Sequence, residues 1–424
     1  MTESPVSPAD SPSPATHTVV PGDPTTPVRL LDTPADGIPD VVTSERRLDA
    51  AAAAIAAGEG SVAIDAERAS GYRYGQRAYL VQIRREGAGT WLIDPMAVPD
   101  LRPLDEAIGG AEWILHAATQ DLACLAEVGL RPRQLFDTEL AGRLLGMPRV
   151  GLAAVVEHYL GLTLAKEHSA VDWSTRPMPQ SWLLYAALDV EVLTEVRNLM
   201  GVDLARAGKD EWARQEFDAL LDWQPTQRPD PWRRTAGMHK VRGARGLAFV
   251  RELWYERDRL AAERDVAPGR LAPDAVLLQI AQHALTDPRS LPSGSRTIAR
   301  YRREWLIALE RAAALPDSGL PPLALPSDGP PPPRAWAEKN PVAARRLGHT
   351  REALSRFAFD HQIPIENVCS PEPLRRIVWS PPDGAPDAAA LDARLASYGV
   401  RPWQRGIVIP LLQEAWAATG VVGE

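Results

Sequence analysis

Two acidic side chains, Asp65 and Glu67, lie two positions apart in the segment VAIDAERA. Apolar and polar residues alternate there, which predicts a β-strand, and residues i and i+2 of a strand face the same side of the sheet. Two carboxylates on one face repel each other, and a divalent cation would relieve that repulsion. The alternative is a solvated strand edge that carries two unrelated acids.

A tyrosine and an aspartate, Tyr185 and Asp189, are four residues apart in LLYAALDVEVL. This spacing places them one above the other on one face of a predicted helix. The residues between them are apolar, so the helix is expected to be buried and Asp189 needs a partner. That partner is a metal ion or a basic group, or else the tyrosine hydroxyl in a hydrogen bond that only fixes the helix.

A further acid, Asp121, lies in HAATQDLACL, close to the start of a predicted helix that follows a buried strand. A carboxylate is favourable in a first turn because of the helix dipole, whether or not it has another role. His116, five residues earlier, is expected to be a core histidine with a satisfied hydrogen bond and not a ligand.

The elements that must position these residues lie in the first half of the chain. We expect a helix near 48–57, strands at SVAIDAERA, AYLVQIRR, TWLIDP and EWILHAA, and then only helices: TQDLACLAEV, TELAGRLLG, LAAVVEHYLG and a long one from Gln180 to about Ala207. Strands followed by helices predict an α/β fold with a central mixed sheet flanked by helices.

Proline-rich segments divide the chain. Residues 1–27 are rich in Pro, Ser and Thr and are predicted to be a disordered tail, and 316–334 are predicted to be an extended linker. A softer boundary near 222–234 leaves three blocks: 28–222, 235–315 and 335–424. The last two have helical patterns throughout. They also share an order of helix, proline-containing turn, apolar connector and second helix, which suggests a duplicated all-α module.

Charge is distributed unevenly along the chain. The net charge is −8, but residues 232–311 contain 16 Lys or Arg and 9 Asp or Glu, a local charge of +7. A basic module beside an acidic one suits a protein that holds a phosphate backbone with one part and metal ions with the other. The predicted phosphate contacts precede the first long helix of the second block: Arg233, Arg234, Lys240, Arg242 and Arg245. A charged linker surface without a ligand is the alternative.

Several classes of protein are excluded. The chain has no run of about 18 apolar residues, so a membrane span is not expected. The N-terminus lacks the charged start and apolar core of a secretory signal, so we expect a cytoplasmic protein. Cys124 and Cys369 are the only cysteines and form no CxxC pair, which argues against a disulfide and a cysteine-bound zinc.

In combination these motifs resemble a known family. DxE on a strand, an Asp after a later strand and YxxxD on a following helix resemble the DEDD superfamily of exonucleases, in its tyrosine-containing branch, and within it ribonuclease D. LVQI, LHAATQDL, LFDTELAGRLLG, VGLAAVVEHYLGLTLAK, DWSTRPMP and YAALDVEVL extend the resemblance over residues 60–200. Block 235–315 is similar to the helicase-and-ribonuclease-D C-terminal (HRDC) domain, and block 335–424 looks like a divergent second copy. Trp182 and Val171 depart from the glutamine and serine expected there, which leaves fine substrate preference open.

The resemblance implies a fold, a mechanism and a substrate. The sheet would be ribonuclease H-like. Asp65, Glu67, Asp121 and Asp189 would hold two divalent ions, Mg²⁺ or Mn²⁺, about 3.5–4 Å apart, and Tyr185 would orient the attacking water. The reaction would be 3′→5′ hydrolysis of single-stranded RNA 3′ ends, such as those of tRNA precursors, by a monomer that releases nucleoside 5′-monophosphates. The alternatives are a DNA exonuclease, because the same acids serve both nucleic acids, and a catalytically silent RNA-binding scaffold.

Overall fold

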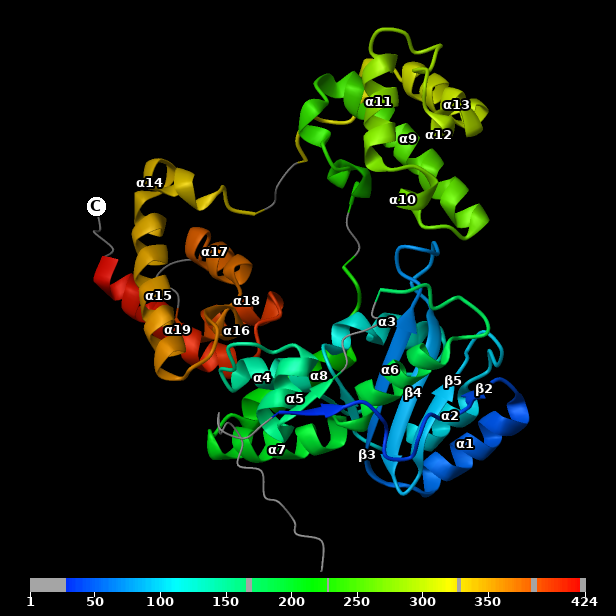
Figure 1. Ribbon diagram of the computed structural model, residues 1–424. Helices are drawn as coiled ribbons and strands as arrows, with labels where there is room; N and C mark the ends of the chain where they lie inside the picture. The colour runs from blue at the N-terminus through cyan, green and yellow to red at the C-terminus, as the bar shows by residue number, and fades with distance from the viewer. Residues whose placement is uncertain (1–27, 165–169, 227–228, 326–328, 383–386, 420–424) are drawn as a thin grey trace, which may run out of the picture.

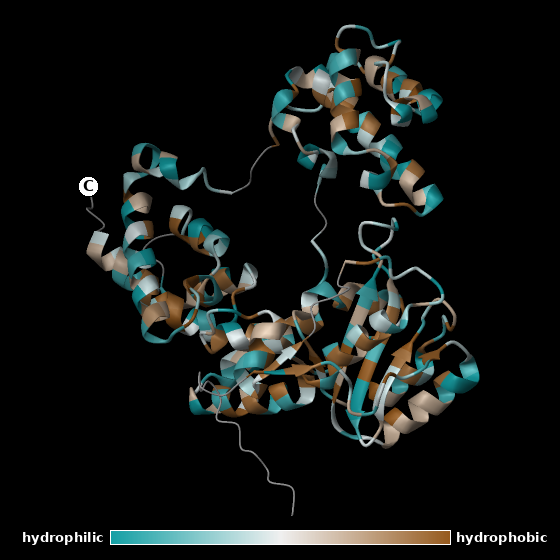
Figure 2. Ribbon diagram, in the orientation of Figure 1, coloured by the Kyte–Doolittle hydropathy of each residue, from teal (hydrophilic) through white to brown (hydrophobic). Residues whose placement is uncertain are grey.

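The computed structural model describes residues 28–164, 170–226, 229–325, 329–382 and 387–419. The predicted disordered tail, residues 1–27, lies outside this part of the chain. Figure 1 shows a domain built on a β-sheet, a helical block above it and a second helical block beside it. In Figure 2 the apolar residues concentrate on the central strands and on the inward faces of the helices.

A six-stranded mixed sheet forms the first domain. Its strand order is β2-β5-β4-β3-β6-β7, with β4 antiparallel to both neighbours and the other pairs parallel. The strands are β2 (Val41–Val42), β3 (Glu59–Arg68), β4 (Ala78–Glu86), β5 (Gly89–Ile93), β6 (Trp113–Leu115) and β7 (Leu135–Asp137). A separate parallel pair joins β1 (Arg29–Leu31) to β8 (Leu162–Leu164). The predicted mixed sheet is therefore confirmed.

Helices cover both faces of this sheet. They are α1 (Glu45–Ala57), α2 (Arg102–Ile108), η1 (Ala118–Gln120), α3 (Leu122–Glu127), α4 (Thr138–Leu144), α5 (Leu152–Leu160), α6 (Gln180–Glu191), α7 (Leu193–Arg206) and α8 (Asp210–Leu221). The alternation of β3 decides which side chains meet which helix. Val62 and Ile64 are buried in the core that includes α1 and α2, whereas Ala63 packs with Val190 and Leu193 of α6 and α7. Asp65 and Glu67 share the face of Ala63, and so they point toward α6.

Two expectations about these elements were wrong. The chain after β6 is not purely helical, because LFD forms the edge strand β7 and LTL forms β8. Strands of three residues are too short for alternation to reveal them. The helix expected from 180 to about 207 is two helices, because the chain bends at Val192 between α6 and α7.

The second block is a helical unit with its own apolar core around Leu253, Leu277 and Trp305. It contains η3 (Met238–Lys240), α9 (Gly243–Arg264), α10 (Pro268–Leu271), α11 (Asp274–Ala284), α12 (Arg296–Arg300) and α13 (Arg302–Ala313). A further short helix, η2 (Pro231–Arg234), precedes the predicted start of the block at 235 and packs on α9, so we describe it with this block. The described part of the predicted linker holds only two short 3₁₀ helices, η4 (Asp317–Gly319) and η5 (Pro333–Ala335), the second of which continues into the third block.

The third block is also helical, but it packs on the sheet domain. It contains α14 (Trp336–Lys339), α15 (Pro341–Asp360), α16 (Ile365–Val368), α17 (Pro371–Trp379), α18 (Ala388–Ser397) and α19 (Pro402–Thr419). The Trp403 ring stacks on Trp212 of α8 with centroids 4.6 Å apart, and its indole nitrogen donates to Glu216 at 2.9 Å. The described helices include none that is both long and apolar enough to cross a membrane. Cys124 and Cys369 are both free and buried.

Candidate active site

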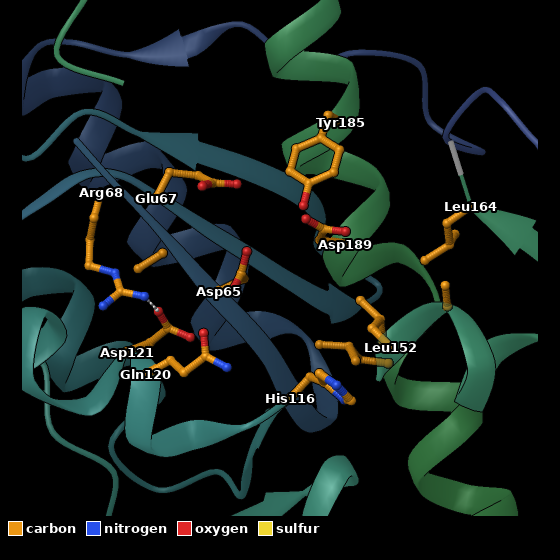
Figure 3. A pocket seen from close by; sticks show the side chains of 13 residues that line it. Asp65, Glu67, Arg68, His116, Gln120, Asp121, Leu152, Leu164, Tyr185 and Asp189 are labelled. Carbon is orange, nitrogen blue, oxygen red and sulfur yellow. Dashed lines mark ion pairs between the residues drawn. The ribbon is translucent and has the colours of Figure 1, made fainter. Parts of the chain in front are cut away.

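A cavity of about 400 Å³ opens where the end of β3 faces α6 and the start of α3. Its walls carry all five residues that the sequence singled out for catalysis, as Figure 3 shows. They are Asp65, Glu67, Asp121, Tyr185 and Asp189. The fold thus brings together side chains that are up to 124 positions apart in the sequence.

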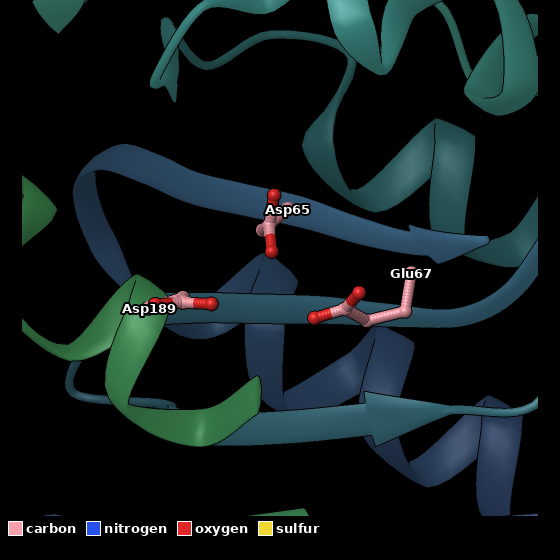
Figure 4. A group of neighbouring side chains, drawn as sticks. All are labelled: Asp65, Glu67 and Asp189. Carbon is pink, nitrogen blue, oxygen red and sulfur yellow. The ribbon is translucent and has the colours of Figure 1, made fainter. Parts of the chain in front are cut away.

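Three of the four carboxylates form one cluster. Asp65, Glu67 and Asp189 each offer an oxygen, and these oxygens all lie within 4.8 Å of one another (Figure 4). Asp121 faces the same cavity but is paired with Arg68, whose guanidinium lies 3.7 Å from the Asp121 carboxylate. The cavity therefore contains four acids, of which three are closely grouped and the fourth is partly neutralised.

Burial and mutual repulsion disfavour the charged form of these acids. Burial is the largest cause, and it raises the pKa of Glu67, Asp121 and Asp189 well above the ordinary range. The negative charge of Asp65 raises the pKa of each of these three acids further, while Arg68 lowers the pKa of Glu67 and Asp121. Such a cluster binds a cation readily, because the cation removes the cost of holding the carboxylates charged and buried.

The tyrosine is positioned as a hydrogen-bond donor. Tyr185 lies one turn before Asp189 on α6, and its hydroxyl donates to the Asp189 carboxylate. Burial and the neighbouring acids raise the pKa of Tyr185 above its usual value. The phenol is therefore neutral at physiological pH, and it can orient a water or a substrate oxygen but cannot serve as a ready base.

The strand pairing of β3 supplies another contact to Asp65. Gln82 of β4 lies opposite Asp65, is fully buried, and directs its amide nitrogen to Asp65 at 3.5 Å. Gln82 belongs to the LVQI motif, but it is 17 residues from Asp65 in the sequence, so this contact could not be predicted from local spacing. Because the glutamine donates to the carboxylate, it orients Asp65 toward the cavity.

The backbone that presents Asp121 is held by a buried aspartate at the end of β7. Asp137 accepts hydrogen bonds from the amides of Ala117 and Ala118 at 3.2 and 2.8 Å. Ala117 has φ +57, a left-handed conformation that costs energy for a residue other than glycine. Asp137 thus stabilises the turn from β6 into η1, and this turn places Asp121 at the start of α3. His116, in the same turn, lies 2.8 Å from the Thr138 hydroxyl.

The DWSTRPMP segment anchors the start of α6. Arg176 donates to both carboxylate oxygens of Asp94 at 2.6 and 2.9 Å, to the Tyr79 carbonyl at 2.8 Å and to the Trp173 carbonyl at 2.7 Å. These contacts fasten the segment before α6 to β4 and to the end of β5. They therefore fix the helix that carries Tyr185 and Asp189.

Sequence reasoning missed Arg68 and Gln120, which also line the cavity. Arg68 directly follows the DxE pair, and its positive charge beside two acids could have marked it as part of the site. In a regular strand, however, Arg68 would lie on the opposite face from Glu67. The register of β3 against β4 is irregular between Glu67 and Arg68. That irregularity turns Arg68 toward Asp121.

Two of the five basic residues proposed from sequence to contact phosphate are engaged by other groups of the protein. Arg233 is engaged within the block by Asp230 at 2.9 Å and the Pro322 carbonyl at 2.9 Å. Arg245 donates to the carbonyls of Ala312 and Leu315 at the end of α13. Arg234, Lys240 and Arg242 are exposed.

The donor set suits a hard divalent cation. Grouped carboxylate oxygens are the ligands preferred by Mg²⁺ and Mn²⁺, and neither cysteine contributes to this cavity. Among the described residues that line the cavity, Arg68 and His116 are the basic ones, and burial lowers the pKa of His116 to about 4, so the acids exceed the positive charge that these residues supply. The residues present therefore fit a metal centre.

Comparison with known proteins identifies the family. Residues 39–205 match the family described as 3′-5′ exonuclease, 246–309 match the HRDC domain, and 329–416 match the 3′ to 5′ exonuclease C-terminal domain. Ribonuclease D of Gluconacetobacter diazotrophicus is 31% identical over 339 residues, which are 77% of this chain and 82% of that protein. The chain belongs to the ribonuclease D family.

Solved structures agree with membership in the ribonuclease D family. A protein from Bifidobacterium adolescentis matches with a TM-score of 0.80 and 37% identity over 91% of this chain and 99% of that one. Escherichia coli RNase D, described as an exoribonuclease involved in structured RNA processing, matches with a TM-score of 0.63 and 25% identity over 88% of this chain and 98% of that one. The predicted 3′→5′ exoribonuclease is thereby confirmed, and exonuclease domains of this type use divalent metals.

Proposed function

We propose that this exoribonuclease trims single-stranded 3′ ends of structured RNA precursors, such as those of tRNA, with two divalent ions held by Asp65, Glu67, Asp121 and Asp189. The observation that carries the proposal is the gathering of these four acids in one cavity, three of them within 4.8 Å. When bound, the ions supply activation of the attacking water and stabilise the charge that develops on the departing 3′ oxygen. The products are nucleoside 5′-monophosphates.

The protein's own groups position the reactants. Tyr185 donates its hydroxyl proton in a hydrogen bond to Asp189, and its hydroxyl oxygen accepts a hydrogen bond from the attacking water and orients it. Arg68 brings a positive charge to the rim near Asp121, where it counters the repulsion between these acids and a phosphodiester. The depth of the acids within the cavity favours a strand end over the middle of a duplex, because an end can enter without unpairing a helix.

The order of the helices supports a division of the chain into an exonuclease domain and two related helical modules. We infer that 28–222 is the exonuclease domain, 235–315 an HRDC domain and 335–424 a second HRDC-like module joined by the linker 316–334. The order of α9 to α11, a long helix, a one-turn helix and a medium helix, recurs in α15 to α17. We further propose that the protein acts as a cytoplasmic monomer.

The decisive experiment compares 5′-labelled single-stranded RNA with DNA of the same sequence, in Mg²⁺, Mn²⁺ or chelator. We expect the RNA to shorten by one nucleotide at a time from its 3′ end, and the cleavage to stop with chelator or with Asp189→Asn. Asp49→Asn, at an exposed position on α1, is the matched control and should be fully active. Equal cleavage of the DNA would favour the DNA exonuclease, and intact strands with retained RNA binding would favour the scaffold.

A further inference from the structure

Four arginines surround a small cavity on the second block, away from the acids. The cavity has a volume of about 360 Å³, and its lining contains no acidic residue: Arg264, Val266, Arg270, Leu271, Arg296, Thr297, Arg300 and Tyr301. We call these eight residues the arginine–tyrosine pocket. It lies where the end of α9, the short α10 and α12 meet.

The positive charge of this pocket is not neutralised within the protein. The Arg264 and Arg300 guanidinium groups lie over the Tyr301 ring, 4.9 and 5.4 Å from its centroid. In the part of the chain that the structure describes, Arg264, Arg296 and Arg300 form no ion pair. Arg257, Arg259 and Arg311 in the same block, by contrast, are each bound to a carboxylate. Three exposed and unpaired guanidinium groups around one hollow are suited to an anion.

The pocket adjoins the loop that leaves the catalytic strand. Arg270 donates to the Gly71 carbonyl at 2.6 Å and lies over the Tyr72 ring at 3.9 Å, and the Ala267 amide donates to the Tyr72 carbonyl at 2.9 Å. Gly71 follows Glu67 by four residues, so their Cα atoms are at most about 14 Å apart. Figure 1 shows α10 beside this loop. An RNA strand whose 3′ end reaches the acids is therefore within a few nucleotides of the pocket.

We propose that the arginine–tyrosine pocket binds the backbone phosphates of the RNA upstream of the 3′ nucleotide, a proposal that rests on the proposed exonuclease function. Arginine suits this role because its planar guanidinium pairs with two phosphate oxygens and stacks on an unpaired base. The site differs from the residues 233–245 that the sequence suggested, two of which are engaged inside the block. It also gives the HRDC block a defined role, which is to hold the strand as its end is consumed.

The test compares the double variant Arg296→Ala/Arg300→Ala with Arg345→Ala/Arg356→Ala, which removes two exposed arginines from α15. Each protein is given a 20-nucleotide RNA and a dinucleotide. The dinucleotide has one phosphodiester, which must lie at the acids, so it leaves none for the pocket. We expect the pocket variant to raise KM for the long RNA about tenfold relative to KM for the dinucleotide, and the α15 variant to leave this ratio unchanged.

Binding without cleavage separates this proposal from the catalytic one. With the long RNA in chelator, loss of two phosphate contacts should make the slope of log K against log salt shallower by about 1.4. An unchanged KM ratio and an unchanged slope in the pocket variant would overturn the proposal that the pocket binds RNA, and they would leave the exonuclease proposal unaffected. Equal losses in the α15 variant would also overturn it, because net charge would then explain the effect. If the wild type cleaves nothing but binds RNA through the pocket, the catalytic proposal fails alone.

Discussion

The charged carboxylates in the catalytic cavity destabilise the folded protein when no cation is bound. The pKa values of Glu67, Asp121 and Asp189 are raised in the folded protein, so the folded state binds protons more tightly than the unfolded state. Their contribution to stability is therefore fully present below the ordinary carboxyl pKa of about 4 and is lost as pH rises through the raised values. At neutral pH the same acids favour unfolding unless a metal ion compensates their charge.

Replacing one of these acids should therefore stabilise the metal-free protein. We expect Asp189→Asn to raise the melting temperature in chelator at pH 7.5 by at least about 2 °C, and to have less effect at pH 5. Mn²⁺ should raise the melting temperature of the wild type but much less that of the variant, because the variant lacks one ligand. Differential scanning fluorimetry measures both. A variant that is less stable than the wild type in chelator at pH 7.5 would contradict the repulsion argument.

Tyr185 is predicted to orient a reactant without exchanging its own proton. Because its pKa is raised above the usual value near 10, the phenolate does not form between pH 6 and 9. Tyr185→Phe should lower kcat about 10–100-fold and leave KM for RNA nearly unchanged. The pH profiles of kcat for variant and wild type should run parallel. Full activity of the variant, or a profile that loses one limb, would exclude the orienting role.

The residues that sequence predicts best are those whose spacing within one element is informative. Asp65 with Glu67 and Tyr185 with Asp189 were expected on one strand face and one helix face, and they lie there. Gln82, Arg68 and Asp137 act across elements. No local spacing relates Asp137 to Ala118, so such contacts become visible only in the folded chain.

At the scale of elements, the segment before α6 fixes the position of this helix against the sheet. Arg176 and Asp94 form a paired contact with side chains that are 33% and 4% exposed. Arg176→Met leaves the Asp94 carboxylate buried without its cation, and we expect it to lower the free energy of unfolding by about 3 kcal/mol and to lower kcat. Arg102→Met breaks an Arg–Asp pair of similar geometry that is open to solvent, and it should have no measurable effect. Urea titration of both variants makes the comparison; equal stabilities would contradict it.

The long elements could be predicted and the short ones could not. β3 and β4 have 10 and 9 residues, long enough for their sequences to be recognised as strands. β7 has three residues, and its leucine, phenylalanine and aspartate are all buried, so neither alternation nor polarity marks it as a strand. The bend at Val192 was also hidden, because apolar residues continue on both sides of it.

For the whole molecule, proline-rich segments predicted where the blocks divide but not how they pack. The core of the sheet domain continues through α8 into the third block, where Leu354, Leu391 and Trp403 belong to the same apolar cluster as the sheet. Lys209 reinforces this junction by donating to the Leu144 and His361 carbonyls at 2.7 and 2.6 Å. The second block has a separate core and contacts the sheet domain through the loop after β3.

This arrangement predicts two unfolding units that do not follow the order of the sequence. The sheet domain and the third block should melt together, and the HRDC block, which lies between them in the chain, should melt separately. Trp403→Ala removes a buried indole from the shared core, and it should lower the free energy of unfolding of the larger unit alone. Trp305→Ala should lower the free energy of unfolding of the HRDC block alone. We expect a loss of about 3–5 kcal/mol in each case. Differential scanning calorimetry resolves the two transitions. If Trp403→Ala instead releases a third transition and leaves the sheet domain at its wild-type temperature, the third block is an independent unit, and the shared core does not couple it to the catalytic cavity.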